Sequence, residues 1–284
     1  MCVTCGCSDD GEVTVTNIDN HHHHSIHNHD HENSHSHTHV LEDGTVITHH
    51  HHSHIPETAQ IHAQVHSTTL SLEQDILAKN NLIAAENRGW FKGRNILALN
   101  LMSSPGAGKT TLLTHTIQDL QSHIPINVIE GDQETLNDAE KIKATGCKVV
   151  QINTGTGCHL DASMIERGLK ELHPPLDSVV MIENVGNLVC PALFDLGENA
   201  KVVILSVTEG EDKPIKYPHM FRASQVMVLT KIDLLPYVQF DVEKCIAYAK
   251  QVNPQILIFQ VSAVTGAGLQ NWYDWIGNQV ARGQ

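Results

Sequence analysis

Residues 103–111 have the composition of a phosphate-binding loop. They read Ser-Ser-Pro-Gly-Ala-Gly-Lys-Thr-Thr, between a stretch that predicts a strand and one that predicts a helix. In such a loop, backbone N–H groups and the helix N-terminus hold the phosphates, the lysine reaches the β- and γ-phosphates, and the first threonine binds Mg²⁺. Ser103 replaces the usual first glycine. The predicted nucleotide-binding residues are Ser104, Gly106, Ala107, Gly108, Lys109, Thr110 and Thr111.

A second motif predicts that the base is guanine. Residues 230–233 read Thr-Lys-Ile-Asp at the end of an apolar stretch. The carboxylate of Asp233 can accept from both the ring N–H and the amino group of guanine, which adenine does not offer, while the stem of Lys231 lies along the base. Thr230 stands where Asn is usual, a departure that would loosen the site. The expected second base-contacting turn is Ser262-Ala263. We therefore expect GTP and GDP rather than ATP.

Two carboxylates are candidates for the γ-phosphate side of the site. Glu183 opens Glu-Asn-Val-Gly, which is typical of a switch segment, and is expected near Mg²⁺. Asp132 ends another predicted strand and can bind the metal through water or orient the attacking water. The alternative is that each carboxylate only caps the turn that follows. No Gln follows Gly186 to position a water molecule, so we expect slow hydrolysis with Lys109, Asp132 and Glu183 as catalytic residues.

The N-terminal part of the chain predicts a second chemistry, metal binding. Cys2, Cys5 and Cys7 surround Gly6, and three thiolates with one nitrogen suit square-planar Ni²⁺ or tetrahedral Zn²⁺. Seventeen of the 22 histidines lie in residues 21–66. So many similar ligands favour weaker storage of several ions over one fixed geometry. The alternatives are that this tract binds metal only incidentally, or that it is an expression tag.

Two cysteines and a histidine further along form another candidate metal site. Adjacent Cys158 and His159 can bind one ion only from an irregular backbone, so a loop is required there. Cys190 lies seven residues beyond Glu183, so a metal bound to it would respond to any movement that the γ-phosphate imposes. The alternative is a structural role, since buried cysteines and a capping histidine are common. Cys147 and Cys245 are interpreted as core and helix residues.

Charge and hydropathy exclude several classes of protein. The first 78 residues contain 11 Asp and Glu and no Lys or Arg, so they hold 11 of the 14 net negative charges. A partner nucleic acid would require a basic surface, which is absent from the sequence pattern. No run of 18 apolar residues predicts a membrane span, and no basic and apolar leader predicts secretion. Seven cysteines without an export signal predict reduced thiols in the cytoplasm.

The elements that position these residues follow from the apolar pattern. Residues 1–66 hold few large apolar side chains and are expected to be a Cys/His-rich tail, disordered without metal. Residues 67–94 are expected to be an amphipathic helix and linker, with the helix over 71–88 capped by Ser71 and stopped by Gly89. Residues 95–284 are expected to be a GTP-binding domain, an α/β fold with a mostly parallel sheet and helices on both faces. Predicted strands are 96–102, 126–129, 148–152, 178–182, 201–207, 225–229 and 255–260, and predicted helices are 110–122, 161–171, 242–251 and 269–280.

Together these motifs resemble the family of hydrogenase nickel-incorporation GTPases, HypB. The strings that carry the resemblance are CxxCGC at 2–7, SSPGAGKTTLL at 103–113, TGTGCHLDA at 154–162, IENVGNLVCPALFDLGE at 182–198 and TEGEDKP at 208–214. It covers the chain from about residue 71 to the end, together with the N-terminal cysteines. It implies a P-loop NTPase of the SIMIBI-like type that forms a homodimer with GTP or metal and delivers Ni²⁺ to the [NiFe]-hydrogenase centre.

The same resemblance assigns metal ligands and partners. It implies one metal site at Cys2, Cys5 and Cys7, and an internal nickel or zinc site near the dimer interface at Cys158, His159 and Cys190. It implies a small zinc-containing maturation protein as partner and the hydrogenase large subunit as acceptor. The presence of both the cysteine motif and the histidine tract implies storage and delivery in one molecule.

Two rival functions are open at this stage. A urease-type nickel GTPase carries a Cys-Pro-His motif in its domain, whereas this chain has Gly-Cys-His-Leu-Asp and a separate Cys-Pro. A metal-storage protein with a dispensable nucleotide domain is disfavoured by the intact Lys109, Thr110, Glu183 and Asp233.

Overall fold

The computed structural model describes residues 14–17, 57–132 and 137–283. The chain separates into two units, one made of Met1–Asp19 with Glu73–Gln284 and the other of Asn20–Leu72. In the second unit the described part is the beginning of one long helix. The sheet, the other helices and the candidate sites belong to the first unit.

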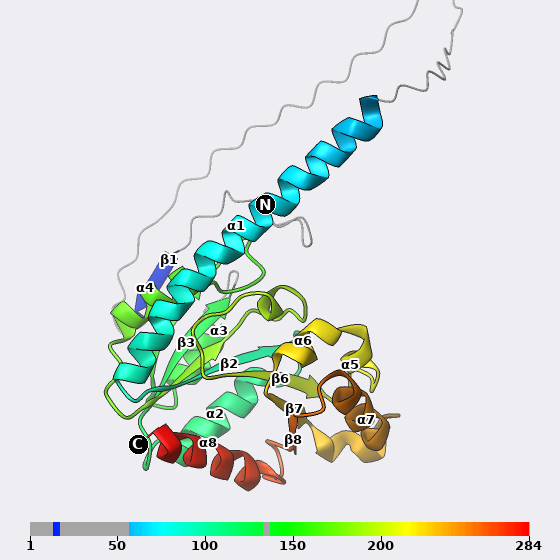
Figure 1. Cartoon of the computed structure of the whole chain (residues 1–284). Helices are drawn as coiled ribbons and strands as arrows, with labels where there is room; N and C mark the ends of the chain where they lie inside the picture. The colour runs from blue at the N-terminus through cyan, green and yellow to red at the C-terminus, as the bar shows by residue number, and fades with distance from the viewer. Residues whose placement is uncertain (1–13, 18–56, 133–136, 284) are drawn as a thin grey trace, which may run out of the picture. The chain divides into compact units, whose positions relative to one another are not determined.

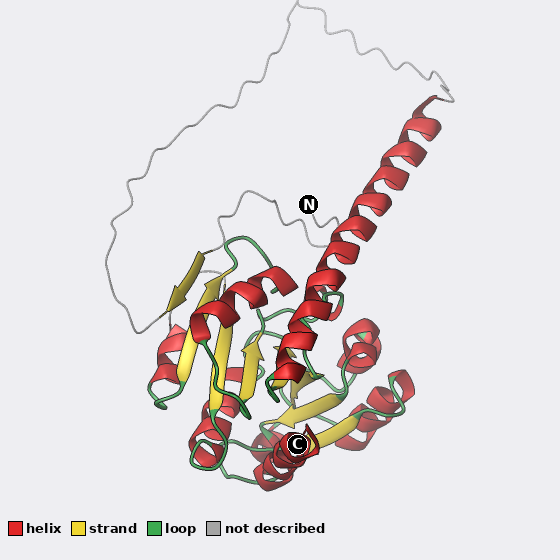
Figure 2. Cartoon of the chain, turned by 60° about the vertical axis from the view of Figure 1, so that its left-hand side comes forward, coloured by secondary structure: helices red, strands yellow, loops and turns green. Residues whose placement is uncertain are grey.

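An eight-stranded sheet organises the first unit, and Figure 2 draws its strands in yellow. The strand order is β1-β4-β3-β5-β2-β6-β7-β8. Seven strands are parallel, and β1 is antiparallel to β4 at one edge. The parallel order predicted from unbroken apolar runs is therefore confirmed. The strands are β1 (Thr14–Asn17), β2 (Leu97–Ser103), β3 (Ile126–Asp132), β4 (Lys148–Asn153), β5 (Val179–Glu183), β6 (Ala200–Ser206), β7 (Val226–Thr230) and β8 (Leu257–Gln260).

Helices cover both faces of the sheet, as Figure 1 shows for α2 and α8 on one side and α1 and α4 on the other. The α-helices are α1 (Glu57–Gly93), α2 (Lys109–Leu120), α3 (Asn137–Lys143), α4 (Ala162–Leu172), α5 (Lys213–Lys216), α6 (Pro218–Ala223), α7 (Val242–Val252) and α8 (Leu269–Gly283). Two 3-10 helices, η1 (Cys190–Ala192) and η2 (Ile232–Tyr237), lie in loops. This is the predicted α/β architecture.

The alternation of side chains along β2 explains the two helical layers. Leu97, Leu99 and Leu101 point into the core shared with α2, α3 and α8. Ala98 points the opposite way, into the core that α1 and α4 cover, and Met102 belongs to the cluster beneath α6 and α7. Because successive strand residues face opposite sides, a central strand between two helical layers must be apolar at nearly every position.

The seven predicted strands and four later predicted helices are confirmed, with ends displaced by at most three residues. The elements that the sequence did not predict are short: β1, α3, α5, α6 and the two 3-10 helices. Each is too short for a clear apolar period, and β1 pairs with β4 through its backbone.

The helix before the sheet is longer than predicted. It begins at Glu57, before Ser71, and continues through Gly89 to Gly93. Glycine weakens a helix but does not terminate it when tertiary contacts hold the next turn. Phe91, 1% exposed, provides that contact because its ring packs with the core of the α4 face. Disorder was predicted for residues 1–66, but two parts of this stretch have regular structure. They are the strand β1 and the first turns of α1, which begins at Glu57.

Two buried asparagines fasten α1 to the loops beside it. The Asn80 amide donates to the carbonyl of Asp195 at 2.8 Å and its oxygen accepts from the Ala162 N–H at 2.9 Å. The Asn87 amide donates to the carbonyls of Ala162 at 2.9 Å and Leu196 at 3.1 Å. One helix therefore holds both the segment that starts α4 and the segment that precedes β6.

No helix in the described part of the chain is both long and apolar enough to cross a membrane.

Candidate functional site

The phosphate-binding loop connects β2 to α2 at the carboxyl edge of the sheet. Its two glycines adopt left-handed backbone angles, with φ of 74° at Gly106 and 91° at Gly108, which side chains disfavour. The next residue, Lys109, begins α2, so the N-terminus of that helix points into the loop. The sequence therefore produces the backbone cradle that the motif predicts.

The predicted phosphate-side residues surround one cavity of about 460 Å³. The loop residues 103–111 line it together with the ends of β3 and β5 and with Lys231. The cavity brings together these predicted residues: Ser104, Gly106, Ala107, Gly108, Lys109, Thr110, Thr111, Asp132, Glu183 and Lys231. Strands that are distant in sequence thus supply one site, because parallel strands end at the same edge.

Glu183 is the centre of the polar contacts in this cavity. Its Oε1 accepts hydrogen bonds from Lys109 Nζ at 2.9 Å and from Thr110 Oγ1 at 2.6 Å. Its Oε2 is buried and has no hydrogen-bond partner within the described residues. A buried carboxylate oxygen without a hydrogen-bond partner, next to the Thr110 hydroxyl, fits a Mg²⁺ site, because Mg²⁺ prefers oxygen ligands.

Two acidic residues in the cavity were not selected from the sequence. Asp138 in α3 accepts from Thr110 Oγ1 at 3.0 Å. Burial raises the pKa of Asp138, but hydrogen bonds from Lys141 and Thr110 outweigh it and hold that pKa below its usual range. Asp138 follows a polar stretch without a recognisable motif, so nothing in the sequence pointed to it.

Glu130 is the second addition. It lies opposite Glu183 in the register of β3 and β5, and the two carboxylates are 3% and 1% exposed. Burial, and then the charges of Glu183 and Asp132, raise the pKa of Glu130 to about 8. The Glu-Gly-Asp string was visible in the sequence, but only the register shows that its glutamate faces Glu183.

The predicted base-binding residues Thr230 and Lys231 are hydrogen-bonded to the phosphate loop. Thr230 Oγ1 donates to the Ala107 carbonyl at 2.6 Å, and Lys231 Nζ donates to the Gly106 carbonyl at 2.7 Å. Thr230 therefore connects the two loops, so the expectation that it loosens the site is not supported by this contact. Ser262 Oγ donates to Asp233 Oδ1 at 2.5 Å, which orients the carboxylate. Ala263 follows Ser262 and begins the next turn.

The internal cysteines and histidine form a compact cluster. The ligand atoms of Cys158, His159 and Cys190 all lie within 4.8 Å of one another, and Cys158 Sγ is 3.6 Å from His159 Nδ1. Residues 154–161 are irregular, as two adjacent ligands require. Burial lowers the pKa of His159, although Asp161 opposes this, and a neutral imidazole is the form that binds metal. Two thiols and an imidazole at this spacing fit Zn²⁺ or Ni²⁺.

Surrounding residues hold the cluster in place. The His159 ring stacks on Phe194, with centroids 3.9 Å apart and planes inclined by 26°. Lys201 Nζ donates to the Phe194 carbonyl at 2.6 Å, and also to the carbonyls of Pro191 at 3.3 Å and Ala192 at 3.4 Å. The segment that carries Cys190 is thereby fixed to the start of β6.

Several predicted ligands lie outside the described residues. These are Cys2, Cys5 and Cys7, and the histidines of residues 21–54. Cys147 and Cys245 are buried, and burial raises the pKa of each thiol to about 12. They therefore remain protonated and match the structural interpretation.

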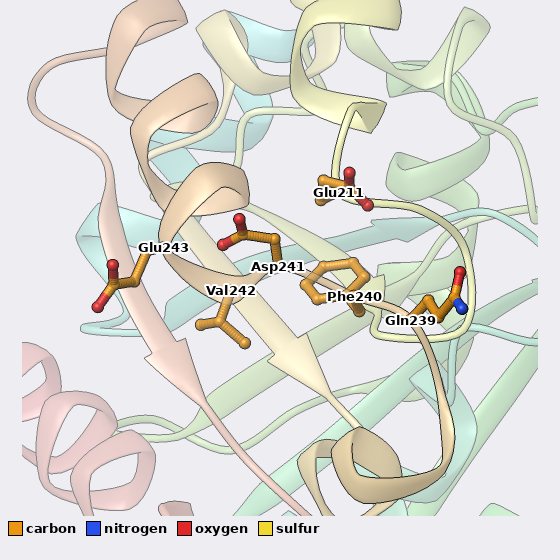
Figure 3. A pocket seen from close by; sticks show the side chains of 6 residues that line it. All are labelled: Glu211, Gln239, Phe240, Asp241, Val242 and Glu243. Carbon is orange, nitrogen blue, oxygen red and sulfur yellow. The ribbon is translucent and has the colours of Figure 1, made fainter.

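A separate cavity of about 720 Å³ lies at the start of α7 (Figure 3). Its carboxylates have structural partners: Asp241 caps α7 by accepting from the Lys244 N–H at 2.9 Å, and Glu211 accepts from Lys244 Nζ at 3.3 Å. None of the predicted site residues lines this cavity, so it is assigned no part in the site.

Comparisons with known proteins agree on one relationship. Residues 97–260 match the family described as CobW/HypB/UreG, nucleotide-binding domain. The chain is 58% identical to the hydrogenase maturation factor HypB of Escherichia coli, across 74% of this chain and 72% of that protein. It is 44% identical to HypB of Cupriavidus necator, across 97% and 88%. Among solved structures, HypB from Helicobacter pylori in complex with nickel is 35% identical with a TM-score of 0.67, covering 72% of this chain and 96% of that one.

Proposed function

Because the chain belongs to the HypB family of hydrogenase maturation factors, we propose that it is a GTP-hydrolysing metallochaperone that stores Ni²⁺ and delivers it for assembly of the [NiFe]-hydrogenase active site. The observation that carries the proposal is the juxtaposition of two sites. Cys190 lies seven residues beyond Glu183, whose carboxylate is bonded to Lys109 and Thr110 of the phosphate loop. A change at the phosphates therefore has a short path to the metal cluster.

The nucleotide chemistry follows from the cavity. Lys109 neutralises charge on the β- and γ-phosphates, and Asp132 orients the attacking water. Thr110 and Glu183 are placed to hold Mg²⁺, which would neutralise the phosphate oxygens when bound. Asp233 selects guanine, and Ser262 keeps its carboxylate oriented. Without a glutamine after Gly186, turnover is slow, and a slow hydrolase suits a timed switch better than bulk catalysis.

The metal chemistry divides between two regions. Cys158, His159 and Cys190 hold one nickel or zinc ion, and three protein ligands leave a position through which the ion can be exchanged. Cys2, Cys5 and Cys7 provide a tight site, and the histidine tract provides storage capacity. The nickel-bound relative from Helicobacter pylori supports nickel as a cargo for this family.

Partners and compartment complete the proposal. The chain works in the cytoplasm as a homodimer with GTP or metal, accepts nickel together with a small zinc-containing maturation protein, and transfers it toward the hydrogenase large subunit. Neither nucleic acid nor a membrane is a partner. Relatives named hydrogenase maturation factors favour this acceptor over urease.

Complementation with Lys109→Ala tests the proposal. The full chain and the variant are expressed in a host that lacks its own homologue, and hydrogenase activity is measured at trace nickel. We expect activity with the full chain and its loss with Lys109→Ala, while Lys148→Ala, an exposed lysine at the start of β4, retains it. Activity that survives Lys109→Ala at trace nickel would mean that the nucleotide switch is dispensable and storage is the main role.

A further inference from the structure

Leu160 connects the metal cluster directly to the nucleotide cavity. It follows His159 in the chain, and its backbone N–H donates to Asn184 Oδ1 at 3.1 Å. Asn184 in turn follows Glu183. Both Leu160 and Asn184 are buried, at 0% and 1% exposure. This hydrogen bond therefore joins the residue after His159, a predicted metal ligand, to the residue after Glu183, which contacts the phosphate loop.

The Leu160 side chain makes a second connection, to the end of β3. A Cβ placed on Gly131 would lie 2.7 Å from Leu160 Cγ, so only glycine leaves room for this leucine. Gly131 stands between Glu130 and Asp132, which both line the nucleotide cavity. Because Leu160 packs closely against the backbone of Gly131, a shift at the end of β3 would act directly on this side chain.

Asn184 also reaches the second metal-bearing segment. Its amide donates to Asn100 Oδ1 at 3.1 Å, and the Asn100 amide donates to Glu198 Oε1 at 3.1 Å. Glu198 Oε2 accepts from the Leu196 N–H at 2.7 Å. All three of these hydrogen bonds are buried, so they lie in a low-dielectric interior where losing one partner is costly.

The two metal-bearing segments are fastened to the sheet at different places. The segment after Cys190 is fastened by Lys201 to the amino end of β6, away from the phosphate loop. The segment with Cys158 and His159 is instead fastened through Leu160 to the carboxyl ends of β3 and β5, where the nucleotide binds. Movement of the strand ends is therefore transmitted to Cys158 and His159.

We propose that Leu160 and Asn184 are positioning residues that couple nucleotide state to metal affinity, by moving Cys158 and His159 relative to an anchored Cys190. This inference rests on the proposed function, because it requires that nucleotide and metal bind at these two sites. Leu160 does not line the nucleotide cavity, whereas Asn184 lines it beside Glu183.

The experiment measures nickel affinity in two nucleotide states. The full chain carries Cys2→Ala, Cys5→Ala and Cys7→Ala, so that thiolate-to-nickel absorption reports only the internal cysteines and the histidine tract is silent. Nickel is titrated against a competing chelator with GDP and with a non-hydrolysable GTP analogue. Energetic coupling between two sites typically changes an affinity about 5- to 150-fold, so the two dissociation constants of this background are expected to differ by at least about fivefold.

The coupling variants break these links at two places. Leu160→Ala removes the contact with Gly131, and Asn184→Ala removes both the acceptor for the Leu160 N–H and the donor to Asn100. In each we expect the two nickel dissociation constants to agree within about twofold, with nickel and nucleotide still bound. By linkage, the effect of nickel on nucleotide affinity must shrink by the same factor.

Two control variants separate coupling from general damage. Leu172→Ala removes a leucine of the same core at the opposite end of α4, and Leu160→Met keeps a side chain against Gly131. Both are expected to keep the difference between nucleotide states. A difference that persists in Leu160→Ala would overturn the inference, even if Asn184→Ala fails to fold. Equal affinities in the background chain itself would instead contradict the proposed function, and with it the coupling.

Discussion

Replacing Lys201 by methionine tests how the segment beyond Cys190 is held. Lys201→Met keeps most of the side-chain length but removes the ammonium that donates to Phe194 at 2.6 Å and lies 3.6 Å from Glu198. A hydrogen bond from a charged group contributes about 1.5–3 kcal/mol, and removing one member of a buried ion pair costs about 3–5 kcal/mol. Glu198 keeps its hydrogen bonds from Asn100 and Leu196 in the variant, so its carboxylate is not left without partners. The cost of removing Lys201 should therefore be near the lower end of the range for a buried ion pair. We expect the free energy of unfolding to fall by about 3 kcal/mol.

Urea unfolding of the full chain provides the measurement, with the m-value compared to confirm that the extent of unfolding is unchanged. The matched control is Lys170→Met, since Lys170 pairs with Glu166 at 2.5 Å but is 68% exposed. An exposed pair of this kind contributes at most about 1 kcal/mol. If Lys201→Met lowers the unfolding free energy no more than Lys170→Met does, the reasoning about the anchored segment is refuted.

Three further results are expected. Thr230→Val removes the hydrogen bond to the Ala107 carbonyl and should weaken GDP binding by about 1–3 kcal/mol in calorimetry, and an unchanged affinity would refute the tie between the loops. In EDTA without nucleotide, the free energy of unfolding should fall as the pH rises from about 5 to 8. The folded chain keeps a proton on Glu130, whose pKa is about 8, whereas the unfolded chain, with a pKa of 4.5 at this residue, releases it. Glu130→Gln should remove this fall, and identical pH profiles for the two chains would contradict the assignment. Cys147 and Cys245 should resist alkylation by iodoacetamide at pH 8 in the folded chain, because burial raises the pKa of each thiol to about 12. Mass spectrometry after brief labelling gives the measurement, and rapid alkylation of either cysteine would contradict the expectation.

The sheet could be predicted because its strands are buried on both faces. The apolar runs that became β2 and β6 contain few polar residues, which distinguishes them from amphipathic helices without knowledge of any partner. By contrast β1 reads Thr-Val-Thr-Asn and pairs through its backbone, and a pattern of four residues carries too little information. The same limit explains why α3, a seven-residue helix, was not predicted.

The site could be predicted where a motif fixes its own geometry. The phosphate loop contains both its glycines and its lysine within a few residues, so local sequence specifies the cradle. Glu130 and Asp138 depend instead on register and on the packing of another element, which no spacing reveals. The same holds for Leu160, whose importance arises from its contact with a glycine in a different strand.

The asparagines of α1 have a consequence for the order in which the protein is made. Asn80 and Asn87 precede their partners by 75 to 115 residues, so the complete set of their hydrogen bonds can form only after the ribosome has extended the chain beyond residue 196. Cys158 and His159 lie just before Ala162, and Cys190 lies just before Asp195. The cysteines and histidines at the N-terminus are therefore synthesised long before the internal cluster can assemble. Under the proposed function, a newly made chain would therefore carry its N-terminal metal ligands before the internal cluster that receives the ion has assembled.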